Sequence, residues 1–200
     1  NAPAQGTKGK GIPADAGLFE RRMRGDHFST KEKTALDGAD MHNRMGMVEM
    51  DAKRMDKAEN RFRLAVQLVP DHVEGLNNLG RVLLNQGKRA EAIVPLREAL
   101  RVADRIPTFD AAAKTTQYVN LADALIEDRD FSGAGETLQA ALKIAPDDAR
   151  VHYTMGQYHL KQIGLNSEHA EQAVYRFNKA LTLSPEHNEA LVGRALAWHA

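Results

Sequence analysis

The chain has 200 residues, of which 42% are hydrophobic and 27% are charged, and its 27 basic side chains balance its 27 acidic ones. A protein that binds nucleic acid or membrane surfaces through general electrostatics carries a basic excess, so this balance argues against both. No run approaches the roughly 18 apolar residues of a membrane span. Cysteine is absent, which excludes disulfides, thiolate metal sites, thiol catalysis and attached c-type haem.

The first 28 residues are predicted to form an irregular, extended arm. Glycine and proline recur through residues 1–13 at a density that no helix tolerates. Two interpretations stay open: the arm lies over the rest of this chain, or it binds a partner. Its candidate apolar anchors are Ile12, Leu18, Phe19, Met23 and Phe28, and its arginine cluster is Arg21, Arg22 and Arg24.

The chain begins with Asn1 rather than methionine, so we expect a processed or trimmed product. Removal of an export signal, excision from a longer protein and incomplete coverage would each explain it. On this basis an exported, periplasmic chain of a bacterium is favoured over a cytoplasmic one.

A capping box is predicted to start the first long helix. Ser29 and Glu32 have the spacing in which the serine side chain accepts from a free backbone N–H and the glutamate reaches back. The helix is therefore expected to begin near Thr30, with Gly38 either breaking it or only weakening it.

One sequence pattern then recurs to the end of the chain. Residues 58–70 read Ala-x3-Phe-x2-Ala-x4-Pro, and the pattern returns at 134–146 and 173–185 with leucine or phenylalanine as the large residue. A further copy at 92–99 lacks only the proline. These spacings place small, large and small residues on one helix face, and proline ends the helix. A neighbouring helix approaches closely only where side chains are short.

Each copy is preceded by a second helical pattern that ends in a small residue. Gly46, Gly80 and Ala122 lie 12 residues before the first alanine of the next copy, and the first two copies are 34 residues apart. A helix-turn-helix unit with this period and pattern resembles the tetratricopeptide repeat (TPR) over residues 39–200. The resemblance implies an all-α fold, a right-handed α–α superhelix occupying 29–200. Its expected units are 39–72, 73–106, 115–148 and 149–187, followed by the first helix of a fifth at 188–200.

Two insertions interrupt the period. Eight surplus residues fall in or near 104–114, where longer flanking helices are expected around Pro107. Five more lie in the turn at 162–167, where Gly164 and Asn166 break the helix. Insertions in repeats map to loops on one face and often carry function, although long loops also persist without any. Contact of either insertion with a partner therefore stays open.

The TPR resemblance also implies a binding surface. First helices of the units line the concave face, which suits an extended peptide or a helix. Asn78 and Asn120 hold equivalent places in successive units, which resembles a short asparagine ladder that bonds a peptide main chain. The alternative is a solvated polar face without a ligand. The expected protein-binding residues are Asn43, Arg44, Met47, Asn77, Asn78, Arg81, Asn120, Asp123, Arg150, Tyr153 and Gln157.

A carboxylate clamp like that of chaperone-binding TPR domains is rejected, because only Asn120 matches outright and Arg150 matches in charge. Catalysis is not expected either, since no phosphate-binding loop, dinucleotide-binding turn or nucleophile elbow occurs. Among the eight histidines, His152 and His159 lie seven apart without a third ligand at helical spacing. We therefore predict no catalytic residue, no cofactor and no metal.

Residues 188–200 are predicted to form a helix against the second helix of the fourth unit. Leu191, Ala195 and Trp198 are expected to face that helix, and a second apolar stripe beside them is left uncovered. Exposed apolar surface favours association, so further chain or another subunit is expected to pack there. The uncovered stripe consists of Val192, Leu196 and His199. The residues expected to pack against the further chain or subunit are Val192, Leu196 and Trp198.

The function predicted from these observations is a protein–protein interaction scaffold or adaptor within a multiprotein assembly, holding a partner segment on the concave face. Two alternatives stay open: a self-associating structural protein that builds homo-oligomers, and a regulatory TPR segment of a larger enzyme. Protein or peptide partners are expected, and neither nucleic acid nor a membrane span is.

Overall fold

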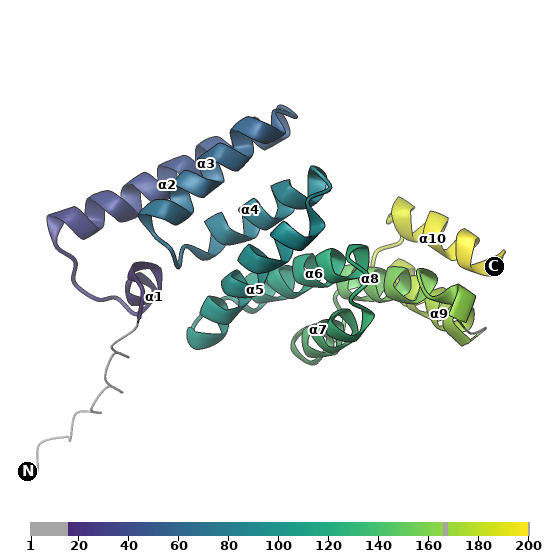
Figure 1. Cartoon of the computed structure of the whole chain (residues 1–200). Helices are drawn as coiled ribbons and strands as arrows, with labels where there is room; N and C mark the ends of the chain where they lie inside the picture. The colour runs from purple at the N-terminus through teal and green to yellow at the C-terminus, as the bar shows by residue number, and fades with distance from the viewer. Residues whose placement is uncertain (1–15, 166–167, 200) are drawn as a thin grey trace, which may run out of the picture.

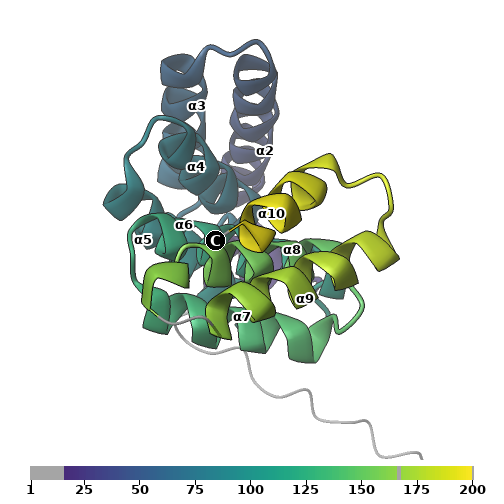
Figure 2. The same ribbon diagram turned by 90° about the vertical axis from the view of Figure 1, so that its right-hand side faces the viewer.

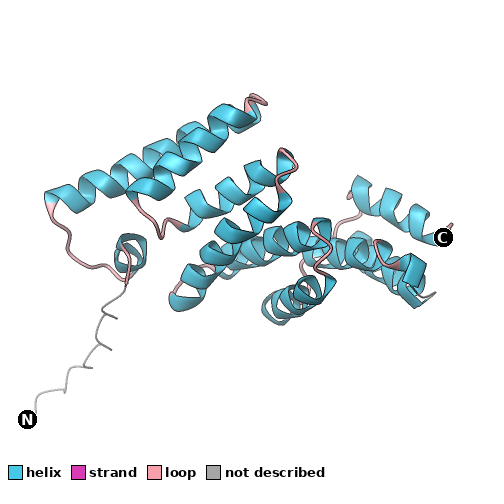
Figure 3. Cartoon of the chain, in the orientation of Figure 1, coloured by secondary structure: helices cyan, strands magenta, loops and turns pink. Residues whose placement is uncertain are grey.

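The computed structural model describes residues 16–165 and 168–199, and every regular element in these ranges is a helix (Figures 1 and 3). The predicted all-α solenoid is confirmed. Among the described helices, none has both the length and the apolar character needed to cross a bilayer. In chain order the elements are α1 (Leu18–Met23), α2 (Thr30–Asp51), α3 (Met55–Leu68), α4 (Val73–Asn85), α5 (Arg89–Arg105), α6 (Ala111–Glu127), α7 (Phe131–Ile144), α8 (Ala149–Leu160), the 3-10 turn η1 (Ile163–Leu165), α9 (Glu168–Leu183) and α10 (Asn188–Trp198).

The helices pack in successive pairs. Helix α2 pairs with α3, α4 with α5, α6 with α7 and α8 with α9, while α10 packs on both α8 and α9. The first helices of the pairs also contact one another in sequence, from α2 through α4, α6 and α8 to α10. The pair α2–α3 therefore lies at one end of the solenoid and α9–α10 at the other (Figures 1 and 2).

The repeated small residues let the two helices of a pair approach closely. A Cβ on Gly46 would lie 2.5 Å from the Phe62 ring, and one on Gly80 would overlap the Leu96 side chain. Both Phe62 and Leu96 are completely buried. The small residues of one helix in the repeated pattern therefore accommodate the large buried residue of its partner helix.

The capping box at the start of α2 is confirmed. Glu32 N–H donates to Ser29 Oγ at 3.3 Å, and Ser29 N–H donates to the Glu32 carboxylate at 2.8 Å. The helix continues through Gly38 without a break. The surplus residues between the second and third pairs do lengthen α5 and α6, which have 17 residues each.

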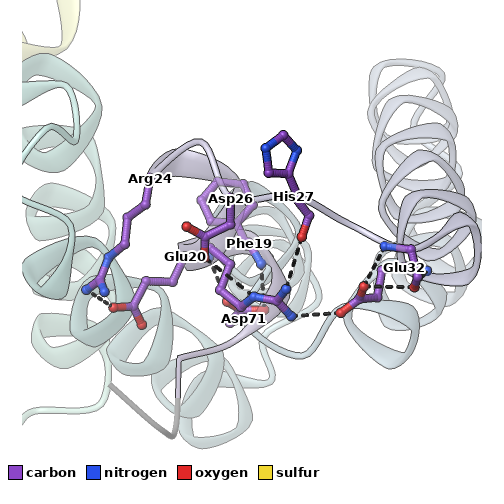
Figure 4. Close-up of polar contacts among 9 residues, drawn as sticks. Phe19, Glu20, Arg24, Asp26, His27, Glu32 and Asp71 are labelled. Atoms are coloured by element: carbon purple, nitrogen blue, oxygen red, sulfur yellow. Dashed lines mark hydrogen bonds and ion pairs between the residues drawn. The ribbon is translucent and has the colours of Figure 1, made fainter. Parts of the chain in front are cut away.

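The end of the arm differs from the expected irregular segment, because residues 18–23 form helix α1. Its first N–H groups, those of Phe19 and Glu20, donate to the Asp71 carboxylate at 3.1 and 2.9 Å (Figure 4). This capping residue lies about fifty positions away in sequence, so local composition could not reveal the helix. Phe19 is completely buried against the first two pairs, whereas Met23 is exposed and does not anchor the arm. The part of the arm before residue 16, Ile12 included, lies outside the described residues.

The prediction for α10 is wrong in one respect: Leu191, Ala195 and Trp198 are exposed and are not buried against α9, although Trp198 borders a hollow beside Tyr175 of that helix. Helix α10 instead turns its smallest residues towards α8 and α9. A Cβ on Gly193 would lie 2.5 Å from the Phe177 ring, so the helix backbone itself packs on that ring. The buried residues of α10 are Ala190, Gly193 and Ala197.

Candidate protein-binding surface

The first helices contact one another and form a continuous surface, which we call the inner face. Polar side chains join these helices. Asn78 Nδ2 donates to Asn43 Oδ1 at 2.9 Å, bridging α4 and α2, and Asn120 Nδ2 donates to Asn77 Oδ1 at 2.8 Å, bridging α6 and α4.

These amide bridges change the interpretation of the asparagine pattern. Asn43, Asn77 and Asn78 are only 9%, 7% and 6% exposed, and their bonds run between helices. A buried amide that already has a partner gives that bond up only at a cost in free energy. The asparagines, expected to bond a peptide main chain, thus bond one another and connect neighbouring units.

A further polar bridge joins α6 and α8, where Arg150 Nη1 donates to Thr116 Oγ1 at 2.9 Å. Arg150 also pairs with Asp148 at 2.7 Å. Three other predicted residues, on α2 and α4, do reach solvent: Arg44, Met47 and Arg81.

The middle pocket, as we call it, lies between α6 and α8 and has a volume of about 330 Å³. It unites three predicted residues, Asp123, Tyr153 and Gln157, and Gln157 Nε2 donates to Tyr153 Oη at 2.8 Å. Burial raises the pKa of the Asp123 carboxyl to about 7, although its hydrogen bond with Thr154 opposes the shift. Among the described residues, no cation lies within ion-pair distance of Asp123. The remaining lining residues are Ile126, Glu127 and Lys161.

The apolar pocket lies between α8, α9 and α10 and has a volume of about 370 Å³. Tyr153 and Phe177 pack together in its wall, with ring centroids 5.9 Å apart. Val192 and Leu196, predicted for the terminal packing face, line this pocket and remain 61% and 56% exposed. The other lining residues are Gln157, Leu160, Asn188, Glu189 and Gly193.

The basic pocket, of about 410 Å³, lies where the turns of successive pairs meet. Glu127 stands between Arg89 and Lys161, with N–O distances of 3.6 and 3.2 Å. Arg129 and Phe131 complete the lining with Ile126. Sequence reasoning missed this pocket, because the TPR resemblance directs attention to first helices, whereas Arg89 begins a second helix and Arg129 lies in a turn.

Histidines do not assemble a metal site in the described part of the chain, where no three His, Asp or Glu side chains converge. His152 bonds the Pro146 carbonyl oxygen at 2.9 Å. His159 Nδ1 lies 3.1 Å from His169 Nδ1, and burial lowers the pKa of His159 to about 4. Two imidazoles without a third ligand are too few for a structural zinc site.

Stacked helix pairs with a connected inner face define a helical repeat solenoid, a class in which each unit packs only on its neighbours. The family follows from direct comparison. Residues 39–105 and 118–148 match models of the tetratricopeptide repeat. The chain is a tetratricopeptide repeat protein, and proteins of this family are generally non-catalytic interaction modules.

Individual relatives are distant. The "DnaJ homolog subfamily C member 7 homolog" of Schizosaccharomyces pombe is 26% identical over 152 residues, which cover 73% of this chain and 31% of that protein. One chain in the crystal structure of the APC/C hetero-tetramer Cut9–Hcn1 superposes with a TM-score of 0.68 at 20% identity, over 78% of this chain and 29% of that one. YrrB, described as "a TPR protein with an unusual peptide-binding site", gives 0.57 at 14% identity, over 86% and 83%. The likeness to these structures shows the fold, and the chain spans about a third of the length of the first two proteins.

Proposed function

We propose that this chain is a protein-interaction scaffold that holds a segment of a partner protein in one groove, which begins at the turns of successive pairs and continues along the inner face. The groove consists of the basic, middle and apolar pockets. The observation that carries the proposal is that these pockets share walls. Glu127 and Lys161 line both the basic and the middle pocket, and Tyr153 and Gln157 line both the middle and the apolar pocket.

The chemistry of the groove suits a peptide segment. Pockets of 330 to 410 Å³ are at the lower end of the range for ligand sites, so each accommodates one or two side chains. Tyr153 and Gln157 offer hydrogen bonds between an apolar end and a charged end. Close packing of α8 and α10 on Phe177 of α9 fixes part of the walls in advance, which lowers the entropic cost of binding.

Site-specific crosslinking tests this proposal. Peptides selected from a display library on the whole chain are bound to variants that carry a photoreactive residue at position 157, in the groove, or at position 139. Gln139 is exposed on α7, outside every pocket described above, and serves as the matched control. We expect crosslinks from position 157 and few from 139. Equal yields, or crosslinks from 139 alone, would place binding elsewhere.

A second candidate function is self-association through α10. Trp198 is 72% exposed and lies outside the groove, in hollows beside Tyr175 and beside Leu191. Exposed apolar surface of this kind favours association. Trp198→Glu should then reduce the mass measured by light scattering without changing peptide binding in the groove. An unchanged monomer mass in both proteins would remove this candidate.

A further inference from the structure

We infer that the groove binds its partner segment in one direction, with an acidic side chain in the basic pocket and an apolar side chain in the apolar pocket. This inference rests on the proposed function and adds to it the chemistry of the partner.

The basic pocket carries more positive charge than its single carboxylate neutralises. Arg89, Arg129 and Lys161 line it, and Glu127 is its only acidic residue. Glu127 already contacts Arg89 and Lys161. Among the described residues, Arg129 has no ion-pair partner. An incoming carboxylate would therefore meet at least one unpaired guanidinium, which can bind it through two parallel N–H donors.

Nearby carboxylates do not neutralise this excess. Asp130 accepts from the Gly133 N–H at 2.9 Å, where it caps α7, and lies 3.6 Å from Arg97. Asp128, in the same turn, does not line the pocket. Phe131 adds an apolar wall, against which the methylene stem of a glutamate or aspartate can pack.

The other two pockets do not favour an acidic side chain. Asp123 and Glu127 both line the middle pocket, and its one cation, Lys161, already contacts Glu127, so an incoming carboxylate would find no unpaired cation there. In the apolar pocket the only charged lining residue is Glu189, again acidic. Like charges repel, and repulsion between mismatched partners sets specificity as attraction does.

The apolar pocket supplies the second anchor. Val192 and Leu196 are largely exposed beside the Tyr153 and Phe177 rings, so a leucine or an aromatic side chain would cover them. Apolar side chains that fill a pocket dominate the energetics of most interfaces. Charge complementarity at one end of the groove and apolar surface at the other thus fix the direction in which the segment binds.

Charge swaps test the inference with peptides as the probe. The peptides come from a random dodecamer display library selected on the whole chain, and affinities are measured by fluorescence anisotropy. Arg129 has a positive φ of 65°, a conformation in which asparagine and aspartate are tolerated, so Arg129→Asn and Arg129→Asp are the variants that preserve the turn. Lys57→Asp, an exposed position on α3 that lines none of the three pockets, is the matched control.

We expect the selected peptides to share an acidic residue and an apolar residue several positions apart. Arg129→Asn should weaken binding roughly 2- to 5-fold, as expected for an exposed ion pair, and Arg129→Asp about 10-fold. A peptide whose acidic residue is replaced by lysine should bind the native chain more weakly than the selected peptide does. The same lysine peptide should bind the Arg129→Asp variant more tightly than the selected peptide binds that variant. Lys57→Asp should leave affinity within about 2-fold.

Two results separate this inference from the function on which it rests. Peptides that crosslink from position 157 but show no acidic preference and no response to Arg129→Asp would refute the orientation and keep the scaffold. Peptides that do not crosslink from position 157 would refute the groove itself.

Discussion

Replacing Phe19 by alanine should release α1 from the solenoid. Helix α1 has 6 residues, far fewer than an isolated helix needs in water, so contacts with the rest of the chain hold it in place. The completely buried Phe19 ring is the largest of these contacts. The Asp71 cap and the Glu20–Arg105 pair, with an N–O distance of 3.3 Å, add to it.

The magnitude follows from the burial. Removing a buried phenylalanine side chain costs about 3–5 kcal/mol. Because α1 lies at the edge and can detach by itself, this cost should fall mainly on local opening rather than on global unfolding. At about 1.4 kcal/mol per factor of ten, a loss of 3 kcal/mol raises the population of the open form roughly 100-fold.

Limited trypsin digestion measures this population, since Arg21, Arg22 and Arg24 lie in or next to α1. Phe19→Ala should accelerate cleavage there by about two orders of magnitude when opening is fast relative to cleavage. Met23→Ala, an exposed position in the same helix, is the control and should change the rate little. Equal cleavage of the native chain and Phe19→Ala would refute the docking of α1.

Three further predictions follow from the core and the groove. Asp123→Asn should stabilise the chain increasingly as the pH rises from about 4 to about 7, because the raised pKa means that ionising the native carboxyl costs folding free energy. The gain in unfolding free energy, measured by urea denaturation, should be about 2–3 kcal/mol larger at pH 8 than at pH 5, and an equal gain at both pH values would contradict it. Gly80→Ala should lower the melting temperature because its methyl group overlaps Leu96, and Leu96→Ala should relieve part of that penalty in a double-mutant cycle; strict additivity would count against the contact. Asn78→Ala should lower the unfolding free energy by about 1–3 kcal/mol by leaving Asn43 without its partner, as measured by urea denaturation; a change below about 0.5 kcal/mol would show that the bridge does not stabilise the joint.

The parts of the fold that were predicted well from the sequence are those in which the interacting residues lie close together or at a fixed spacing in the chain. The capping box at Ser29 spans four residues, and the pairing of Gly46 with Phe62 repeats at a fixed spacing. For α10 the same reasoning was wrong, because it placed the large residues inwards. Contact with a ring such as Phe177 requires the smallest residues of the helix to face it.

The candidate site was predicted only in part. Asp123, Tyr153 and Gln157 were expected on the inner face and do share a pocket. Whether an asparagine there faces a ligand or another asparagine depends on the register between neighbouring first helices, which no local pattern encodes. The basic pocket combines turn residues from successive pairs, such as Arg89 and Arg129, and only the stacking of the pairs brings them together.

One aromatic ring connects the groove to the end of the solenoid. Phe177 packs against Gly156 of α8 and against Gly193 of α10, and its edge forms part of the apolar pocket. A ligand bound in that pocket, as proposed above, would contact residues of both α8 and α10. Its binding would therefore oppose detachment of α10 from the solenoid. By reciprocity, a partner that packed on the outer side of α10 and held it in place would raise the affinity of the groove by the same factor.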